Sequence, residues 1–101
     1  MKALDKPSIL NPSSLFADIT IAIVDSDYKI ASLVKKLLTS LGSKRIFIVH
    51  DGLEVIELMK TEQVDMVITD WDLKAMSGLE LTIYLRQSLD SPNRMIPIVM
   101  L

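Results

Sequence analysis

Short apolar runs alternate with amphipathic segments along most of the chain. The runs are rich in β-branched residues and apolar on both faces, as in strands buried in a parallel sheet. They cover residues 19–24, 46–49, 64–69 and 96–101. The segments between them have helical spacing and cover residues 28–41, 53–60 and 79–89. This alternation predicts an α/β fold, a doubly wound parallel sheet with helices on both faces.

Residues 28–41 carry the clearest helical pattern. Their apolar positions are spaced by three and four, which places them on one helical face; they are Ile30, Leu33, Val34, Leu37, Leu38 and Leu41. Asp27 is suited to cap the start of this helix, and Gly42 is suited to end it. The pattern predicts a helix whose apolar face packs on the sheet.

Residues 1–18 show no sustained period. They contain Pro7, Pro12 and a pair of serines among scattered apolar residues. We therefore predict a loose N-terminal extension over residues 1–18, docked through Leu15 and Phe16, and a domain over residues 19–101.

Acidic residues follow two of the predicted strands. Asp25 and Asp27 come directly after the first strand, and Asp70 and Asp72 come directly after the third. Ligand sites in doubly wound sheets lie beyond the carboxyl ends of the strands, so we expect these carboxylates to meet at one edge. Close carboxylates repel each other unless a cation, shared protons or solvent intervenes. A divalent metal beside an exposed aspartate suits phosphoryl transfer onto that aspartate, here Asp70.

Composition removes several other classes of function. The chain has 101 residues, of which 50% are hydrophobic and 24% are charged, as expected for one globular domain. Its 11 basic and 13 acidic residues form no basic stripe, so no nucleic-acid surface is predicted. The absence of cysteine excludes thiol catalysis and suits a cytoplasmic protein. The apolar runs are far shorter than the ~20 residues that span a bilayer, so no membrane contact is predicted.

Three segments carry a pattern that a known family shares. They are Ile21-Ala-Ile-Val-Asp25, His50-Asp-Gly-Leu-Glu-Val55 and Asp70-Trp-Asp-Leu-Lys-Ala-Met-Ser-Gly78-Leu-Glu-Leu81, and Arg86 and Ile96-Pro-Ile-Val-Met100 continue in register. Through these segments the chain resembles a response-regulator receiver domain of two-component signalling. The resemblance implies a flavodoxin-like receiver fold of the chemotaxis-receiver kind.

The resemblance also implies roles for the acidic residues. Asp70 would be the phosphoacceptor, taking a phosphoryl group from the phosphohistidine of a histidine kinase or a histidine phosphotransfer protein. Asp25, Asp70 and the backbone carbonyl of Asp72 would hold Mg²⁺. Such a receiver acts in the cytoplasm and is not an enzyme beyond self-catalysed phosphoryl transfer and autodephosphorylation.

The chain departs from the family pattern at three places. Ser26 stands where the family usually has a second acid, and a neutral oxygen compensates less charge, so weak Mg²⁺ binding is expected. Lys74 replaces a proline that the family carries four residues after the phosphoacceptor. The family's last strand and last two helices have no counterpart here, so residues 19–101 correspond to a partial receiver domain.

Individual residues keep alternative interpretations. Asp25 could cap the first helix, although Asp27 is the better placed cap. Ser26, Asp27 and Trp71 could each line the site. The Trp71 side chain is equally compatible with a partner contact and with simple packing.

Alternative functions also stay open. Because Ser26 weakens the metal site, the chain could be a degenerate receiver that acts as a phosphorylation-independent protein–protein interaction module. A metal-dependent aspartyl-phosphate hydrolase would use Asp72 as its second acid, but the family's loop and C-terminal residues for that chemistry are absent. In each case residues 96–101 would form an apolar sheet edge, which predicts a homo-oligomer.

Overall fold

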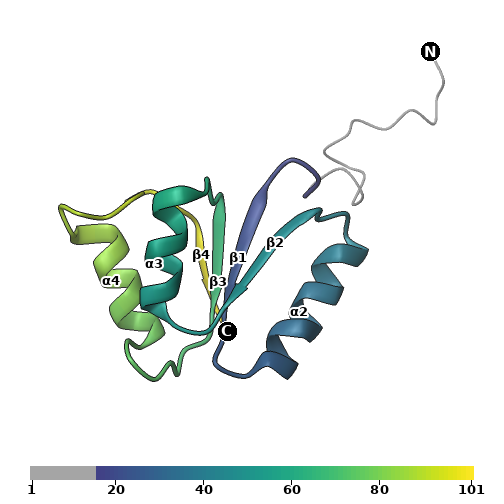
Figure 1. Cartoon of the computed structure of the whole chain (residues 1–101), viewed down its shortest axis with the longest axis horizontal. Coiled ribbons are helices and arrows are strands. Elements are labelled where there is room, and N and C mark those ends of the chain that lie inside the picture. The colour runs from purple at the N-terminus through teal and green to yellow at the C-terminus, as the bar shows by residue number, and fades with distance from the viewer. Residues whose placement is uncertain (1–15) are drawn as a thin grey trace, which may run out of the picture.

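The chain is described by a computed structural model that covers residues 16–101. Seven elements follow one another in the order β1 (Thr20–Val24), α2 (Tyr28–Ser40), β2 (Arg45–Val49), α3 (Gly52–Thr61), β3 (Met66–Thr69), α4 (Gly78–Gln87) and β4 (Ile98–Met100). Figure 1 shows α2 on one side of the sheet and α3 and α4 on the other. The predicted α/β fold with helices on both faces is confirmed.

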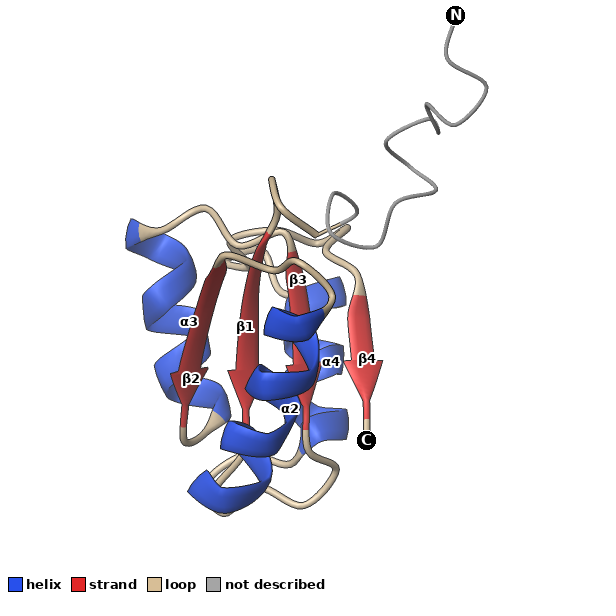
Figure 2. Ribbon diagram, turned by 90° about the vertical axis from the view of Figure 1, so that its right-hand side faces the viewer, coloured by secondary structure: helices blue, strands red, loops and turns tan. Residues whose placement is uncertain are grey.

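The four strands form one parallel sheet in the order β2-β1-β3-β4. Val24, the last residue of β1, pairs with Val49 of β2 and with Thr69 of β3. In Figure 2 the strand arrows all point the same way, toward the end of the molecule where the chain finishes. The residues that follow β1, β2 and β3 therefore emerge together at the carboxyl edge of the sheet.

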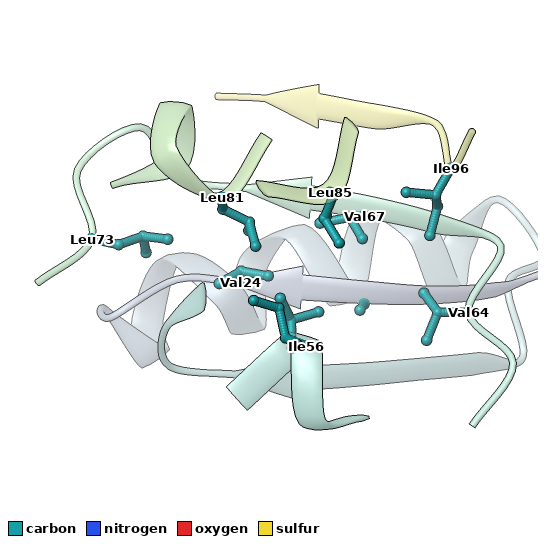
Figure 3. Packing of buried hydrophobic residues seen from close by; sticks show 10 residues of the cluster. Val24, Ile56, Val64, Val67, Leu73, Leu81, Leu85 and Ile96 are labelled. Carbon is teal, nitrogen blue, oxygen red and sulfur yellow. The ribbon is translucent and has the colours of Figure 1, made fainter. Parts of the chain in front are cut away.

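Strand β1 is the centre of the core, and all five of its residues are buried. Its side chains alternate between two apolar clusters, one on each face of the sheet. The cluster under α3 and α4 contains Val24, Val67, Leu81 and Leu85 (Figure 3). The cluster under α2 contains Ile21, Ile23, Ala31 and Ile68. Each buried valine, leucine or isoleucine of these clusters contributes roughly 1.5–3 kcal/mol, which stabilises the sheet and the position of its strand ends.

Helix α2 differs from its prediction. Only part of the apolar face packs on the sheet, through Ala31, Val34 and Leu38. A second row remains between 41% and 58% exposed; it consists of Ile30, Leu33, Leu37 and Leu41. At about 100° per residue these two rows lie roughly a quarter turn apart. The apolar face of α2 is therefore wider than the part of the helix that packs on the sheet.

The ends of α2 agree with their prediction. The Asp27 carboxylate accepts a hydrogen bond of 2.9 Å from the backbone N–H of Lys29. Gly42 has a φ of 99°, which side chains disfavour, and it follows directly after the C-cap. A capping acid and a glycine stop thus set the length of the helix.

Two predicted strands are shorter in the structure by two residues or more. Strand β3 begins at Met66 rather than at residue 64, and β4 spans three residues rather than six. Before β3, the Asp65 carboxylate accepts the Thr20 N–H at 2.8 Å and replaces a ladder bond at the start of β1. Ile96 is fully buried on the α3 and α4 side although it precedes β4. Apolar burial therefore extends beyond the hydrogen-bonded strands, and a hydropathy pattern does not separate the two.

The described part of the chain begins with a turn over residues 16–18. Phe16 is half-buried and packs against the cluster under α2, while Leu15 lies outside the described residues. The division into a loose extension over residues 1–18 and a domain over residues 19–101 stays a prediction. Between residues 16 and 101, no helix has the length and apolarity that crossing a membrane requires.

Candidate functional site

Asp25 and Asp70 occupy equivalent positions on neighbouring strands. Val24 and Thr69 are register partners, and the two aspartates are the next residue along each strand. The Asp70 N–H donates to the Val24 carbonyl at 2.8 Å, and the Asp25 N–H donates to the Val49 carbonyl at 3.0 Å. The sheet ladder thus continues one residue beyond each strand. It holds the two aspartates at about the 4.8 Å spacing of adjacent strands.

The Asp25 carboxyl is poorly placed to be charged. The residue is only 7% exposed, and one carboxylate oxygen accepts the Asp27 N–H at 2.8 Å. Burial raises the pKa of this carboxyl above its usual value, the Asp27 N–H opposes that change, and the charges of Asp70 and Asp27 raise it further. Burial, more than the neighbouring charges, therefore disfavours the Asp25 carboxylate, and a bound cation would offset both effects.

The other acidic and polar residues of this edge are more exposed. Ser26, Asp27 and Asp72 all lie at the surface, and the Asp27 carboxylate is already engaged as the cap of α2. Across residues 16–101 no three His, Cys, Asp or Glu side chains gather closely enough to hold a metal ion. The structure thus brings together two carboxylates, those of Asp25 and Asp70. The family resemblance implies that Asp72 would bind the metal through its backbone carbonyl. The grouping of side chains gives no information on that carbonyl.

Trp71 follows Asp70 and is 58% exposed. Its backbone is held on two sides, because its N–H donates to the Leu101 carbonyl at 3.3 Å and its carbonyl accepts the Gly78 N–H at 3.0 Å. Neither core cluster includes its side chain. The sequence left two interpretations of Trp71 open, a partner contact and simple packing. The structure excludes packing of the ring in the core.

Two further residues support Asp70 and were not identified from the sequence. Thr69 is fully buried, and its hydroxyl donates to the Asp70 carbonyl at 3.0 Å. Gly78 opens α4 so close to Asp70 that a Cβ atom there would lie 2.4 Å from the Asp70 carbonyl oxygen. The available signals were a hydroxyl at the end of an apolar strand and a glycine beside a helix cap. Neither signal shows which backbone atom the hydroxyl would bond or the glycine would approach.

We predict that Gly78→Ala destabilises the protein by roughly 2 kcal/mol or more, because a backbone carbonyl cannot move aside as a side chain can. Gly52→Ala is the matched control, since Gly52 likewise begins a helix after its cap but would meet the flexible Met76 sulfur at 3.0 Å. Urea denaturation of both variants measures the effect. Equal losses in the two variants would contradict the close approach of Gly78 to Asp70.

We also predict that Asp25→Asn stabilises the protein at pH 7 without divalent cations. The raised pKa means that the folded state holds the Asp25 proton more tightly than the unfolded state does. The resulting stability is present below the ordinary value of 3.8 and is lost as pH rises through the raised value. Asparagine keeps the oxygen that accepts the Asp27 N–H and removes the charge.

Thermal unfolding of the wild type and Asp25→Asn, compared at a series of pH values, tests this assignment. The advantage of the variant should grow from acid pH toward neutrality. A wild type that is more stable than the variant at pH 7 would show that burial and neighbouring charges do not disfavour the Asp25 carboxylate.

The sequence matches known proteins over most of its length. The family model of the response regulator receiver domain matches residues 21–101. Chemotaxis protein CheY-3 of Vibrio cholerae is 32% identical over 81 residues, which are 80% of this chain and 61% of that protein. The chain thus spans about three fifths of the length of this relative.

Solved structures show the same fold. The N-terminal domain of a response regulator receiver protein from Methanoculleus marisnigri is similar at a TM-score of 0.71 and 26% identity, over 80% of this chain and 63% of that one. A chain in the co-crystal of Saccharomyces cerevisiae Ypd1, a histidine phosphotransfer signaling protein, and the receiver domain of Ssk1 is similar at a TM-score of 0.67 and 16% identity, over 84% of this chain and 62% of that one.

The family match covers β1 to β4 together with both aspartate-bearing strand ends. The described part of the sheet has the parallel order and helix placement of the solved receivers it resembles. The chain belongs to the response regulator receiver domain family.

Proposed function

We propose that this receiver accepts a phosphoryl group on Asp70 from a protein phosphohistidine. The observation that carries the proposal is the placement of Asp70 one residue beyond β3, partly exposed and bonded through its N–H to β1, beside the buried Asp25. A nucleophile must be accessible yet fixed, and Asp70 meets both conditions. The family is a signalling family, so the chemistry serves signal transduction rather than turnover of a metabolite.

The proposed step is a direct transfer between two side chains. A carboxylate oxygen of Asp70 attacks the phosphorus, the phosphorus–nitrogen bond to the donor histidine breaks, and the histidine nitrogen leaves with the bonding pair and takes up a proton. The product is an acyl phosphate on Asp70. Its charge of about −1.5 to −2 appears beside Asp25, so the step adds to a repulsion that already exists.

The residues at this edge fit a magnesium ion. Mg²⁺ is usually held by one or two carboxylates together with water and substrate oxygens, and Asp25 and Asp70 supply two such carboxylates. When bound, the ion would neutralise charge on the phosphoryl oxygens. Ser26 is exposed and offers only a neutral oxygen, which supports the prediction of weak binding.

The partner surface that we propose begins at α2, which starts three residues after Asp25. Its exposed apolar row offers Ile30, Leu33 and Leu37 to a partner on the side of the helix that the sheet leaves open. The yeast co-crystal pairs a histidine phosphotransfer protein with a receiver domain. We propose the same class of donor, a histidine phosphotransfer protein or a histidine kinase, for this chain.

Incubation with phosphoramidate and Mg²⁺, followed by intact-mass and peptide analysis, tests the proposal. One phosphoryl group should appear on Asp70, and it should be labile in base, as acyl phosphates are. Asp70→Asn should carry no label, whereas Asp72→Asn, two residues away and exposed, should label normally. Label that persists in Asp70→Asn, or a wild type that takes none, would favour the alternative of a phosphorylation-independent interaction module.

Self-association also stays a prediction. In the described residues β4 is paired only with β3, and three residues form its ladder. An unpaired apolar strand edge promotes pairing with another chain. Residues 96–101 are the segment through which such a homo-oligomer would form.

A further inference from the structure

Trp71 combines three properties that rarely coincide. It adjoins the proposed phosphoacceptor, its side chain is 58% exposed, and its backbone is fixed by hydrogen bonds to the Leu101 carbonyl and from the Gly78 N–H. More than half of the accessible surface of Trp71 stays in water, and this part gains no hydrophobic stabilisation from folding. Neither core cluster includes the ring, so packing in the core does not account for its position.

A second exposed aromatic residue follows the other strand that ends in an aspartate. Tyr28 is the first residue of α2 and is 64% exposed. The loop after β1 thus leads from Asp25 to an exposed tyrosine, and the loop after β3 leads from Asp70 to an exposed tryptophan. Tryptophan and tyrosine are the residues most enriched among protein–protein hot spots.

The charge of this edge identifies the kind of partner. Four aspartates follow the two strands; they are Asp25, Asp27, Asp70 and Asp72. A protein that brings a phosphohistidine to this edge must approach these negative charges with a negative phosphoryl group. Basic side chains around its histidine would compensate both, and an apolar surface would cover the exposed rings.

We propose that Trp71 is a specificity-determining contact that anchors a phosphohistidine-bearing protein donor over Asp70. The inference rests on the proposed function of Asp70 as phosphoacceptor. The partner has an apolar patch that covers the indole ring and basic side chains that face the aspartates. A small phosphodonor has no such patch, so Trp71 serves transfer from proteins and is dispensable for transfer from small molecules.

The variant Trp71→Ala separates these two kinds of donor. Phosphorylation of Asp70 is followed in the full chain with phosphoramidate and, separately, with phosphorylated Ypd1, the yeast phosphotransfer protein of the co-crystal. We expect Trp71→Ala to slow transfer from Ypd1 by at least about tenfold, as a hot-spot truncation does. Labelling by phosphoramidate should change by less than about twofold, and Trp71→Phe should recover part of the transfer from Ypd1.

Leu89→Ala is the matched control. Leu89 is also a large apolar residue, 89% exposed, but it lies in the connection between α4 and β4, at the opposite end of the sheet from Asp70. Its removal should leave both rates unchanged. Urea denaturation of each variant checks that the fold is retained, which the absence of Trp71 from both core clusters leads us to expect.

Each outcome decides a separate question. Equal slowing with both donors would assign Trp71 to the chemistry of Asp70 and overturn its role as a partner contact. Unchanged transfer from Ypd1 in Trp71→Ala would also overturn that role. Failure of phosphoramidate to label the wild type at Asp70 would instead remove the proposed function on which the inference rests.

Discussion

The proximity of two carboxylates is the constraint on which the carboxyl edge of this domain depends. Asp25 and Asp70 are not held there by their side chains, which repel each other. They are held by backbone hydrogen bonds that extend the ladders of β1 and β3, above all the 2.8 Å bond from the Asp70 N–H to the Val24 carbonyl. The apolar burial of β1 keeps that bond in place. The energy gained in the core therefore maintains an unfavourable charge arrangement at the surface.

The residues that support Asp70 are small or buried because they contact its backbone. Thr69 fixes the Asp70 carbonyl with its hydroxyl, and Gly78 lets α4 approach that same carbonyl without a side chain between them. Such contacts limit the freedom of the Asp70 backbone, so its carboxylate is held at the carboxyl edge, where the proposed phosphoryl transfer would need it. Ser26, where the family pattern usually has an acid, is exposed and takes no part in these backbone contacts.

The sequence predicts the strands and helices better than the contacts and exposed surfaces around the site. Parallel strands such as β1 have a continuous apolar pattern because both faces are buried, and Asp27 and Gly42, the better placed cap and the glycine stop, lie at the two ends of α2. The approach of Gly78 to Asp70 is a three-dimensional contact between backbones, which no local pattern encodes. The exposed row of α2 could not be predicted either, because spacing shows that residues share a face and does not show how much of that face finds a partner.

Binding of Mg²⁺, followed through Trp71 fluorescence, tests the central claim most directly. Trp71 is the only tryptophan of the chain, so its signal reports on the residue beside Asp70. The account predicts weak saturable binding in the wild type, tighter binding in Ser26→Asp and loss of binding in Asp25→Asn. Equal Mg²⁺ affinity in all three proteins would contradict the claim that the Asp25 and Asp70 carboxylates form one cation-dependent site.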